Sequence, residues 1–283
     1  MPQIQKRTFG PDGPEITRVG LGGEGILRTH GQDDPACAVI EAALEQGIAY
    51  YDTAVAYSGS QSYLGRVWQA RPNDRARIFH TSKSAGRSKN HALADLDDTL
   101  RTLHTDYLDL WQIHDVRSMS ELDAIAGPNG ALEAFVRARQ SGKVRYIGVT
   151  GHHDPAVLTR AVEEWPVDAV LMPVNPVEAA LGGFLDQTLP LARAKGLAVI
   201  GMKALGAGHY ISPQADVTAE RLIRYALAQD VDVLIVGCST PDEVKLLAQI
   251  GSDPMVMSQQ ERDSLIDLFQ PRAIRLAYYR GTV

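Results

Sequence analysis

The chain alternates short apolar runs with segments that have helical spacing. Each run is short enough for one strand and is rich in apolar residues, many of them β-branched. The runs cover residues 16–22, 48–54, 77–83, 107–114, 146–151, 169–175, 197–203 and 233–238. Between two of them, Leu93, Leu96 and Leu100 recur at intervals of three and four, which places an apolar stripe on one face of a helix. The pattern therefore predicts eight strand–helix units.

Eight such units predict an α/β chain folded as a (β/α)8 TIM barrel. The runs end at intervals near the roughly 30 residues of a β-α-β unit, and a doubly wound open sheet is the competing architecture. Residues 4–19 predict a β-hairpin around a Pro/Gly/Asp turn, which would cap the bottom of the barrel. Residues 258–270 predict an additional C-terminal helix capped by Ser258. No linker divides residues 1–283, so a single domain is expected.

The composition of the chain indicates what kind of partner it binds. The chain has 283 residues, of which 45% are hydrophobic, and its net charge is −6 with both signs interspersed. No surface for nucleic acid or anionic lipid is indicated, and a small molecule is the expected partner. No apolar run approaches the roughly 20 residues that span a bilayer, so a cytoplasmic protein is expected. Cys37 and Cys238 are too few for a disulfide framework or a cysteine-rich metal site, and each is expected to be a small buried residue.

Four residues with proton chemistry lie near the ends of neighbouring predicted strands. Asp52, Lys83 and His114 end the second, third and fourth runs, and Tyr57 follows in the loop after the second. In a β/α barrel these ends converge on the mouth that holds the active site. An ammonium would lower the pKa of a nearby phenol, a carboxylate would hold that ammonium, and a neutral imidazole would hydrogen-bond a carbonyl group. Each residue alone has an ordinary structural explanation, but together they indicate a catalytic site.

The same residues resemble the motifs of a known family. The stretches DTAVAYSGSQSYLGRVW (52–68), IFHTSKS (78–84) and LHTDYLDLWQIHD (103–115) are similar to those of the aldo-keto reductases, and the likeness runs from about residue 4 to about 270. The resemblance implies a nicotinamide-dependent carbonyl reductase or alcohol dehydrogenase. It also implies that Tyr57 protonates the carbonyl oxygen as hydride arrives, while Lys83 and Asp52 tune Tyr57 and His114 orients the substrate.

The resemblance further implies a dinucleotide bound at the ends of the later strands, without a G-x-G-x-x-G turn. Gly151 stands where many members have an asparagine, so His152 or Asn175 would have to compensate for the missing amide. Met202 replaces an aromatic ring that stacks on the nicotinamide, and Leu171 or Met172 replaces a glutamine. The implied cofactor-binding residues are Thr150, Gly151, Asn175, Met202, Lys203, Leu205, Gly206, Gly208, Gly237 and Ser239.

The adenosine end departs from the family pattern. Ser239 or Thr240 would accept a phosphate at a helix N-terminus, where free N–H groups favour anions. Val244 fills the approximate place of the arginine found in many NADPH-preferring members, and Asp242 and Glu243 would repel a 2′-phosphate that they face. The family implies NADP as cofactor, and NAD stays open. A metal site is not expected.

Two alternatives remain at this point. The first is a lyase that uses Lys83 or Lys203 as a Schiff-base nucleophile. The second is a regulatory protein that binds a nucleotide on a reductase-like barrel. Substrate, reaction direction and oligomeric state are not predicted. Possible pocket-wall residues, each with an ordinary core or surface alternative, are Glu24, Val55, Trp111 and Tyr278.

Overall fold

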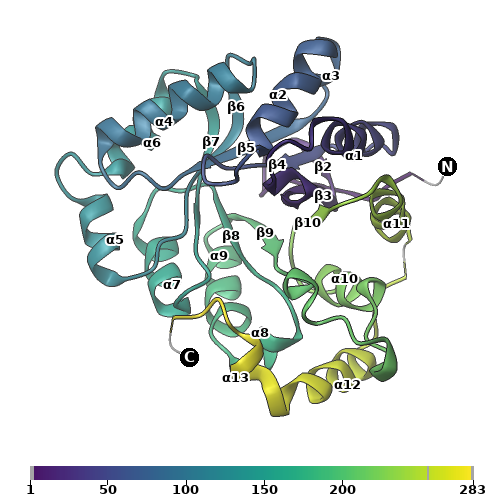
Figure 1. The fold of residues 1–283 in the computed structure, drawn as a ribbon. Coiled ribbons are helices and arrows are strands. Elements are labelled where there is room, and N and C mark those ends of the chain that lie inside the picture. Colours follow the sequence, from purple (N-terminus) through teal and green to yellow (C-terminus); the bar gives the residue numbers. More distant parts are fainter. Residues whose placement is uncertain (1–2, 254, 282–283) are drawn as a thin grey trace.

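Eight parallel strands close into a barrel in the computed structural model, which describes residues 3–253 and 255–281 (Figure 1). The order around the barrel is β10-β3-β4-β5-β6-β7-β8-β9. The predicted (β/α)8 barrel is confirmed, and the doubly wound sheet is wrong. The strands of the barrel are β3 (Val19–Gly25), β4 (Tyr50–Asp52), β5 (Phe79–Ser84), β6 (Leu108–Ile113), β7 (Val144–Thr150), β8 (Ala169–Pro173), β9 (Ala198–Met202) and β10 (Val233–Cys238).

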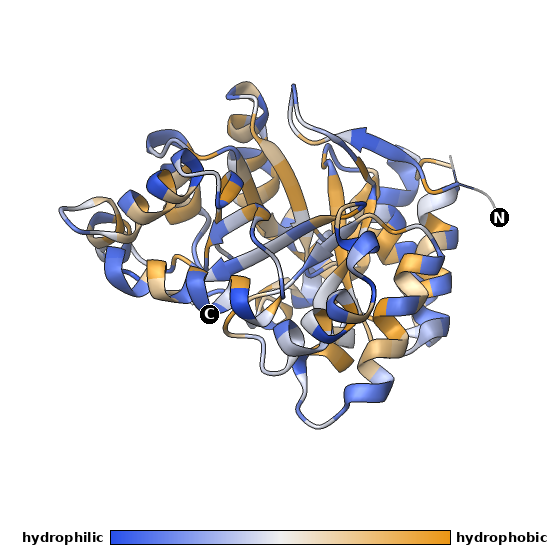
Figure 2. Ribbon diagram, turned by 90° about the horizontal axis from the view of Figure 1, so that it is seen from above, coloured by the Kyte–Doolittle hydropathy of each residue, from blue (hydrophilic) through white to orange (hydrophobic). Residues whose placement is uncertain are grey.

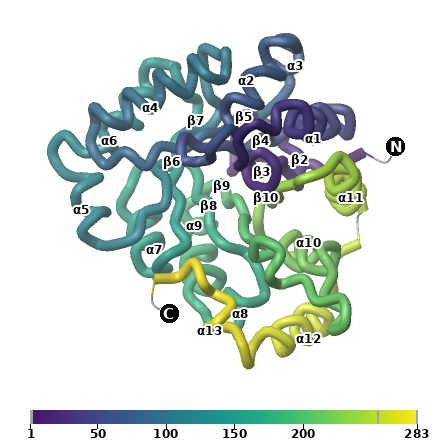
Figure 3. The backbone as a smooth tube through the Cα atoms, viewed as in Figure 1, coloured from purple at the N-terminus to yellow at the C-terminus, as the bar shows by residue number. Residues whose placement is uncertain are grey.

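Helices follow the strands and surround the barrel, and Figure 3 traces the chain once around it. Short 3-10 turns include η1 (Ile26–Arg28) after β3 and η3 (Gly206–Gly208) after β9. The α-helices are α1 (Asp33–Glu45), α2 (Ser60–Ala70), α3 (Pro72–Arg75), α4 (Lys89–Thr102), α5 (Met119–Ala126), α6 (Ala131–Gln140), α7 (Pro155–Glu164), α8 (Pro176–Leu181), α9 (Leu189–Ala194), α10 (Ala219–Leu227), α11 (Pro241–Ser252), α12 (Gln259–Phe269) and α13 (Ala273–Leu276).

A hairpin closes the amino-terminal end of the barrel, as predicted. Its strands β1 (Lys6–Thr8) and β2 (Glu15–Thr17) pair antiparallel. Phe9 and Ile16 are buried against residues inside the barrel, and the Phe9 ring lies 4.6 Å from that of Phe79. The first predicted run, 16–22, is therefore divided: its first two residues belong to the hairpin, and the barrel strand begins at Val19.

The core has an inner part within the barrel and a larger outer part between strands and helices. In Figure 2 hydrophobic segments run through the strands and parts of the helices, whereas many peripheral loops are hydrophilic. Leu96 is fully buried on α4, which confirms the predicted stripe. The predicted extra helix is α12, and Ser258 forms a capping box with Glu261 at its start. Cys238 is buried, but Cys37 is only partly so.

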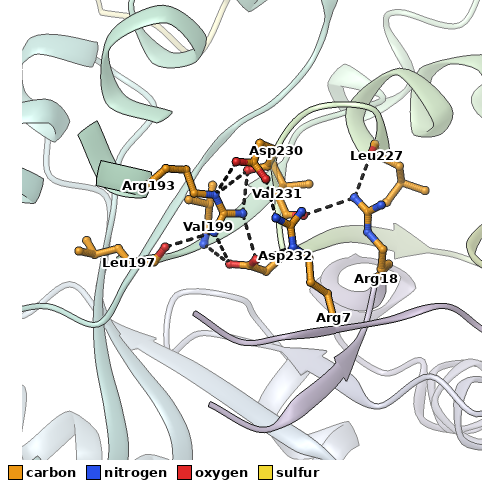
Figure 4. Close-up of polar contacts among 9 residues, drawn as sticks. All are labelled: Arg7, Arg18, Arg193, Leu197, Val199, Leu227, Asp230, Val231 and Asp232. Atoms are coloured by element: carbon orange, nitrogen blue, oxygen red, sulfur yellow. Dashed lines mark hydrogen bonds and ion pairs between the residues drawn. The ribbon is translucent and has the colours of Figure 1, made fainter. Parts of the chain in front are cut away.

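An arginine–aspartate network fixes the hairpin to the bottom of the barrel (Figure 4). The Asp232 carboxylate, which is 2% exposed, accepts hydrogen bonds from Arg193 at 2.9 and 3.0 Å and from the Val199 amide at 2.8 Å. Arg7 of β1 reaches the same carboxylate at 3.2 Å. Asp230 beside it is 55% exposed and also contacts Arg7. One buried carboxylate therefore joins three separate segments of chain.

Replacing Asp232 with alanine is expected to lower the free energy of unfolding by roughly 3 kcal/mol, because the buried Val199 amide loses its acceptor and Arg193, which keeps Asp230, loses its buried partner. The exposed Asp230→Ala variant is the matched control, and its loss should stay below about 1 kcal/mol. Urea unfolding of both variants measures the difference. Equal losses would show that burial of Asp232 adds nothing to its ion pairs.

Candidate functional site

A buried ion pair lies at the carboxyl ends of β4 and β5. The Lys83 Nζ is 2.5 Å from Asp52 Oδ2, and both side chains are at most 1% exposed. The ammonium also donates to the Thr53 carbonyl at 2.9 Å, and the Thr81 hydroxyl donates to Asp52 Oδ1 at 2.9 Å. Asp52 stands opposite Thr81 in the register of the two strands, so strand pairing itself brings these groups together. Two of the predicted residues therefore meet.

Tyr57 covers this ion pair from the turn after β4. Its ring centre is 4.7 Å from Lys83 Nζ and 5.5 Å from the His114 ring, which it meets edge-on. The backbone turn is held by the Tyr57 amide, which donates to the Ala54 carbonyl at 3.0 Å. The four residues predicted from the strand ends thus form one cluster at the barrel mouth.

The pKa of Tyr57 differs from the expectation. Burial, together with the Asp52 carboxylate, raises the pKa of Tyr57 well above its ordinary value. The expected lowering of this pKa by the ammonium is therefore wrong, because the desolvation of a phenolate outweighs the nearby positive charge. The phenol keeps its proton at neutral pH and is available as a proton donor.

His114 is held neutral, as expected. Burial and the Lys83 ammonium lower the pKa of His114 to about 3. Its amide donates to the Ser84 carbonyl at 2.9 Å, and Arg87 donates to its carbonyl at 2.8 Å. The backbone around the imidazole is therefore fixed from the neighbouring strand, and the ring can offer a neutral hydrogen bond at the mouth.

Arg28 is a part of the site that the sequence reasoning missed. Its guanidinium carbon is 5.0 Å from the centre of the Tyr57 ring, and its Nη1 is 2.7 Å from Glu24 Oε1. Glu24 lies near the end of β3 and Arg28 lies in η1 directly after it, and both side chains are about half exposed. Glu24 is among the possible wall residues of the sequence analysis, and the argument from strand ends that includes it extends to Arg28, four residues later.

Three predicted cofactor residues at the later strands already have partners within the chain. The Thr150 hydroxyl accepts from the Asp115 amide at 2.9 Å. The Asn175 amide donates to the Lys203 carbonyl at 3.1 Å and to the Tyr279 hydroxyl at 3.0 Å, and its oxygen caps α8. The Lys203 ammonium lies 5.0 Å from the Tyr279 ring, with no carboxylate partner among the described residues. Of these three residues only Lys203 is charged, and its charge is therefore available to a ligand.

The remaining predicted cofactor-binding residues differ in how much space surrounds them. Met202 is partly buried at the end of β9. A Cβ at Gly151 would lie 3.2 Å from a backbone oxygen, which leaves little room for a larger residue. A Cβ at Gly237 would lie 2.7 Å from that of Glu24, so this glycine permits two strands to approach. In the η3 loop, Leu205 is partly buried, Gly206 and Gly208 have positive φ angles of 52° and 88°, and only Gly208 faces open space.

The N-terminus of α11 is occupied by the chain's own carboxylate. Glu243 Oε2 accepts from the Ser239 amide at 2.6 Å, and the Thr240 hydroxyl accepts from the Glu243 amide at 3.3 Å. Asp242 is exposed beside it and pairs with Lys245, whereas Val244 is fully buried. A phosphate that used Ser239 would have to replace Glu243.

Among the other possible wall residues, the prediction for Trp111 is wrong. Its side chain is fully buried and stacks on Phe135 of α6 with ring centres 3.6 Å apart, so it faces the helices rather than the mouth. Val55 and Tyr278 are exposed, as wall residues can be. In the part of the chain that the structure describes, no group of three or more His, Cys, Asp or Glu residues is arranged to hold a metal ion, and none of the helices is long and apolar enough to cross a bilayer.

The structure is a closed parallel barrel with an ion pair, a phenol and a neutral imidazole at its mouth. Enzymes with this fold have their active sites at the same end of the barrel. A family model described as the aldo/keto reductase family matches residues 18–213. The chain belongs to the aldo-keto reductase family. The family consists of oxidoreductases that act on carbonyl compounds, so the lyase and the nucleotide-binding regulator are not favoured.

Individual relatives agree with this assignment. L-galactose dehydrogenase of Arabidopsis thaliana is 26% identical, over 92% of this chain and 94% of that protein. The 6-dehydroglucose reductase of Novosphingobium aromaticivorans is 27% identical, over 90% of this chain and 86% of that protein. The solved structure of an aldo-keto reductase from Klebsiella pneumoniae in complex with NADPH is 20% identical, with a TM-score of 0.75 over 94% of this chain and 96% of that one.

The lowered pKa of His114 predicts a pH-dependent stability. An unfolded histidine titrates near 6.5, whereas the folded one titrates at about 3, so the unfolded state binds the extra proton as pH falls below about 6.5. Stability is therefore complete above that pH and is lost toward acid. Between pH 7 and pH 5, the wild type should lose about 2 kcal/mol more than His114→Gln in urea unfolding. The same loss in both proteins would contradict a neutral His114.

Proposed function

We propose that this chain reduces a small hydroxylated carbonyl compound, or oxidises the matching alcohol, with NADP(H) as cofactor and Asp52, Tyr57, Lys83 and His114 as its catalytic residues. The observation that carries the proposal is the buried Lys83–Asp52 pair directly beneath the Tyr57 ring, with the neutral His114 ring at its edge. This arrangement can deliver one proton to an oxygen atom at the mouth. The fold alone would not supply that chemistry.

Each catalytic residue has a distinct task in the proposed reaction. Tyr57 donates its phenolic proton to the carbonyl oxygen, and in the reverse direction it takes the proton of the alcohol. Lys83 stabilises the phenolate that forms, and Asp52 keeps the ammonium charged and in place. His114 hydrogen-bonds the substrate oxygen without supplying charge, because its imidazole is neutral.

The mouth also fits a nicotinamide dinucleotide. When bound, the cofactor supplies or accepts the hydride at the carbonyl carbon. Lys203, whose ammonium has no carboxylate partner among the described residues, would interact with the phosphates, and the η3 loop offers backbone at Gly208 with open space. Met202 would pack on the nicotinamide. Thr150, Gly151, Asn175, Leu205, Gly206, Gly237 and Ser239 stay predictions as cofactor-binding residues.

The substrate class follows from the polar pair at the mouth. Glu24 and Arg28 offer an acceptor and a donor beside Tyr57, which suits the hydroxyl groups of a sugar. Two relatives have names that refer to sugars, L-galactose and 6-dehydroglucose. We therefore include sugar carbonyls among the substrates. We also propose that residues 1–283 act as one catalytic domain in the cytoplasm, without nucleic acid.

Side-by-side calorimetric titration with NADPH and NADH tests the cofactor before any substrate is chosen. NADPH is the family's cofactor, and saturable binding of NADPH supports the proposal. The acidic N-terminus of α11 makes NADH the informative comparison. Failure of both to bind at millimolar concentration would overturn hydride transfer.

Replacing Tyr57 with phenylalanine removes the proton donor and little else. We expect kcat for carbonyl reduction to fall by roughly 10²–10⁴-fold, while the affinity for NADPH changes little. Tyr107→Phe is the control, because this tyrosine lies against Arg75 and Arg145 away from the cluster. Full activity in the Tyr57 variant would remove Tyr57 from the acid role.

The Glu24–Arg28 pair predicts two opposite shifts of the pH–rate profile. The Arg28 guanidinium lowers the pKa of Tyr57 and the Glu24 carboxylate raises it, although burial has the larger effect. In alcohol oxidation, which needs the phenolate, Arg28→Met should therefore shift the rising limb of kcat/KM to higher pH, and Glu24→Gln should shift it to lower pH. Both shifts should shrink with added salt, since both side chains are exposed. Shifts in the same direction would refute this electrostatic role.

A further inference from the structure

Tyr279, in the segment that follows α13, contacts the ends of three barrel strands, and its side chain is buried. Its hydroxyl accepts a hydrogen bond at 3.0 Å from the amide of Asn175, which lies just after β8. Its ring centre is 5.0 Å from the ammonium of Lys203, which directly follows β9. Its carbonyl oxygen is 3.3 Å from Nδ1 of His152, in the loop after β7. One residue therefore joins three segments at the mouth of the barrel.

A buried carboxylate fixes the segment that carries Tyr279. Glu178 of α8 accepts a hydrogen bond from the Tyr279 hydroxyl at 2.7 Å and forms an ion pair with the Arg280 guanidinium. The Gly281 amide donates to the His153 carbonyl at 3.2 Å. In Figure 1 this segment runs from α13 past α8 toward α7. Because a buried ion pair is stable only with good geometry, these contacts leave Tyr279 little freedom to move.

The Tyr279 hydroxyl orients the Asn175 side chain. Burial and the Glu178 carboxylate raise the pKa of Tyr279 well above its ordinary value, so the hydroxyl keeps its proton and donates it to Glu178. Its oxygen is left to accept from Asn175 Nδ2, which also donates to the Lys203 carbonyl at 3.1 Å. Asn175 Oδ1 accepts from the Glu178 amide. The side-chain amide is thus held on both its oxygen and its nitrogen.

Lys203 is held in a strained backbone conformation. Its φ angle is 58°, in the left-handed region that residues with a Cβ rarely adopt. Such a conformation persists where the surrounding contacts hold it. The Asn175 amide supplies one of these contacts at the Lys203 carbonyl, and the Tyr279 ring lies beside the ammonium of the same residue. Loss of the Tyr279 hydroxyl would therefore loosen Asn175 and, through it, Lys203.

His152 links Tyr279 to the loop that follows His114. Its Nδ1 faces the Tyr279 carbonyl, and its Nε2 is 3.2 Å from Asp115 Oδ1. Asp115 comes directly after His114 in the chain. Tyr279 is therefore connected both to residues proposed for the cofactor and to the loop that begins at the residue proposed to orient the substrate.

We propose that Tyr279 is a positioning residue, which holds Asn175 and Lys203 where the bound dinucleotide is aligned with the substrate. This inference rests on the proposed function, because Asn175 and Lys203 are cofactor-binding residues only within it. Tyr279 itself exchanges neither the hydride nor the proton. A displacement of about 1 Å between reacting groups can slow a reaction by about 10²-fold, so a residue that only fixes its neighbours can control the rate.

Tyr279→Phe tests this role, because it removes the hydroxyl and keeps the ring and the backbone carbonyl. Tyr210→Phe is the matched control. The Tyr210 side chain is buried in the same cluster, donates to the Leu276 carbonyl at 3.2 Å and lies 3.4 Å from the Tyr279 hydroxyl. Its loss leaves the bonds of Tyr279 to Asn175 and Glu178 in place.

Two measurements separate alignment from folding. Calorimetry gives the dissociation constants for NADPH and NADH. Stopped-flow mixing of saturating glyceraldehyde with equal concentrations of enzyme and NADPH gives the rate constant and the amplitude of the first turnover. The rate constant reports alignment in the folded enzyme, whereas the amplitude reports the fraction of enzyme that is active. Relative to Tyr210→Phe, we expect Tyr279→Phe to lower the rate constant by about tenfold and to weaken both dinucleotides by a similar factor.

The proposal is overturned if the rate constant and both affinities of Tyr279→Phe stay within twofold of those of Tyr210→Phe, and a larger loss in either quantity supports it. It is overturned as well if only the amplitude falls, because Tyr279 would then support the fold alone. Absence of NADPH oxidation by the wild type would instead contradict the hydride-transfer function, and the two affinities would still decide the role of Tyr279.

Discussion

The buried ion pair between Lys83 and Asp52 is the interaction on which the site depends. Removing two charges from water costs several kcal/mol for each ion, and their attraction offsets this cost only with good geometry and further hydrogen bonds. The Thr53 carbonyl and the Thr81 hydroxyl supply those bonds. All four groups come from two adjacent parallel strands and from Thr53, which directly follows the first of them, so the register of β4 against β5 determines whether the pair is stable.

The position of Tyr57 follows from that pair and from the neighbouring strand. The Tyr57 ring lies over the Lys83 ammonium, and a cation is attracted to the face of an aromatic ring. The short turn after β4, closed by the hydrogen bond from the Tyr57 amide to the Ala54 carbonyl, keeps the ring in this position. A Cβ at Gly23 of β3 would come within 2.8 Å of the Tyr57 ring, so the glycine provides the space. The same burial raises the pKa of Tyr57. The phenol therefore keeps its proton at neutral pH and is ready to donate it.

Much of the fold and the cluster of Asp52, Tyr57, Lys83 and His114 could be predicted because both depend on local patterns. Strand length and helical spacing gave the barrel, and in a parallel barrel all strand ends meet at one mouth, which brought Asp52, Lys83 and His114 together. The orientation of Trp111 could not be predicted, because parallel strands are apolar on both faces and composition does not distinguish them. Contacts between distant segments, such as that of Asn175 with Tyr279, depend on where the C-terminal segment lies.

The distribution of charge differs between two places that the sequence analysis assigns to cofactor phosphates. At α11, the usual place for an anion, the amide of Ser239 is bonded to Glu243, so a phosphate there would have to displace a carboxylate that the same helix N-terminus favours. At the end of β9, by contrast, the Lys203 ammonium has no carboxylate partner among the described residues. An incoming anion there displaces no carboxylate of the chain. The electrostatic cost of binding an anion is consequently lower at Lys203 than at the N-terminus of α11.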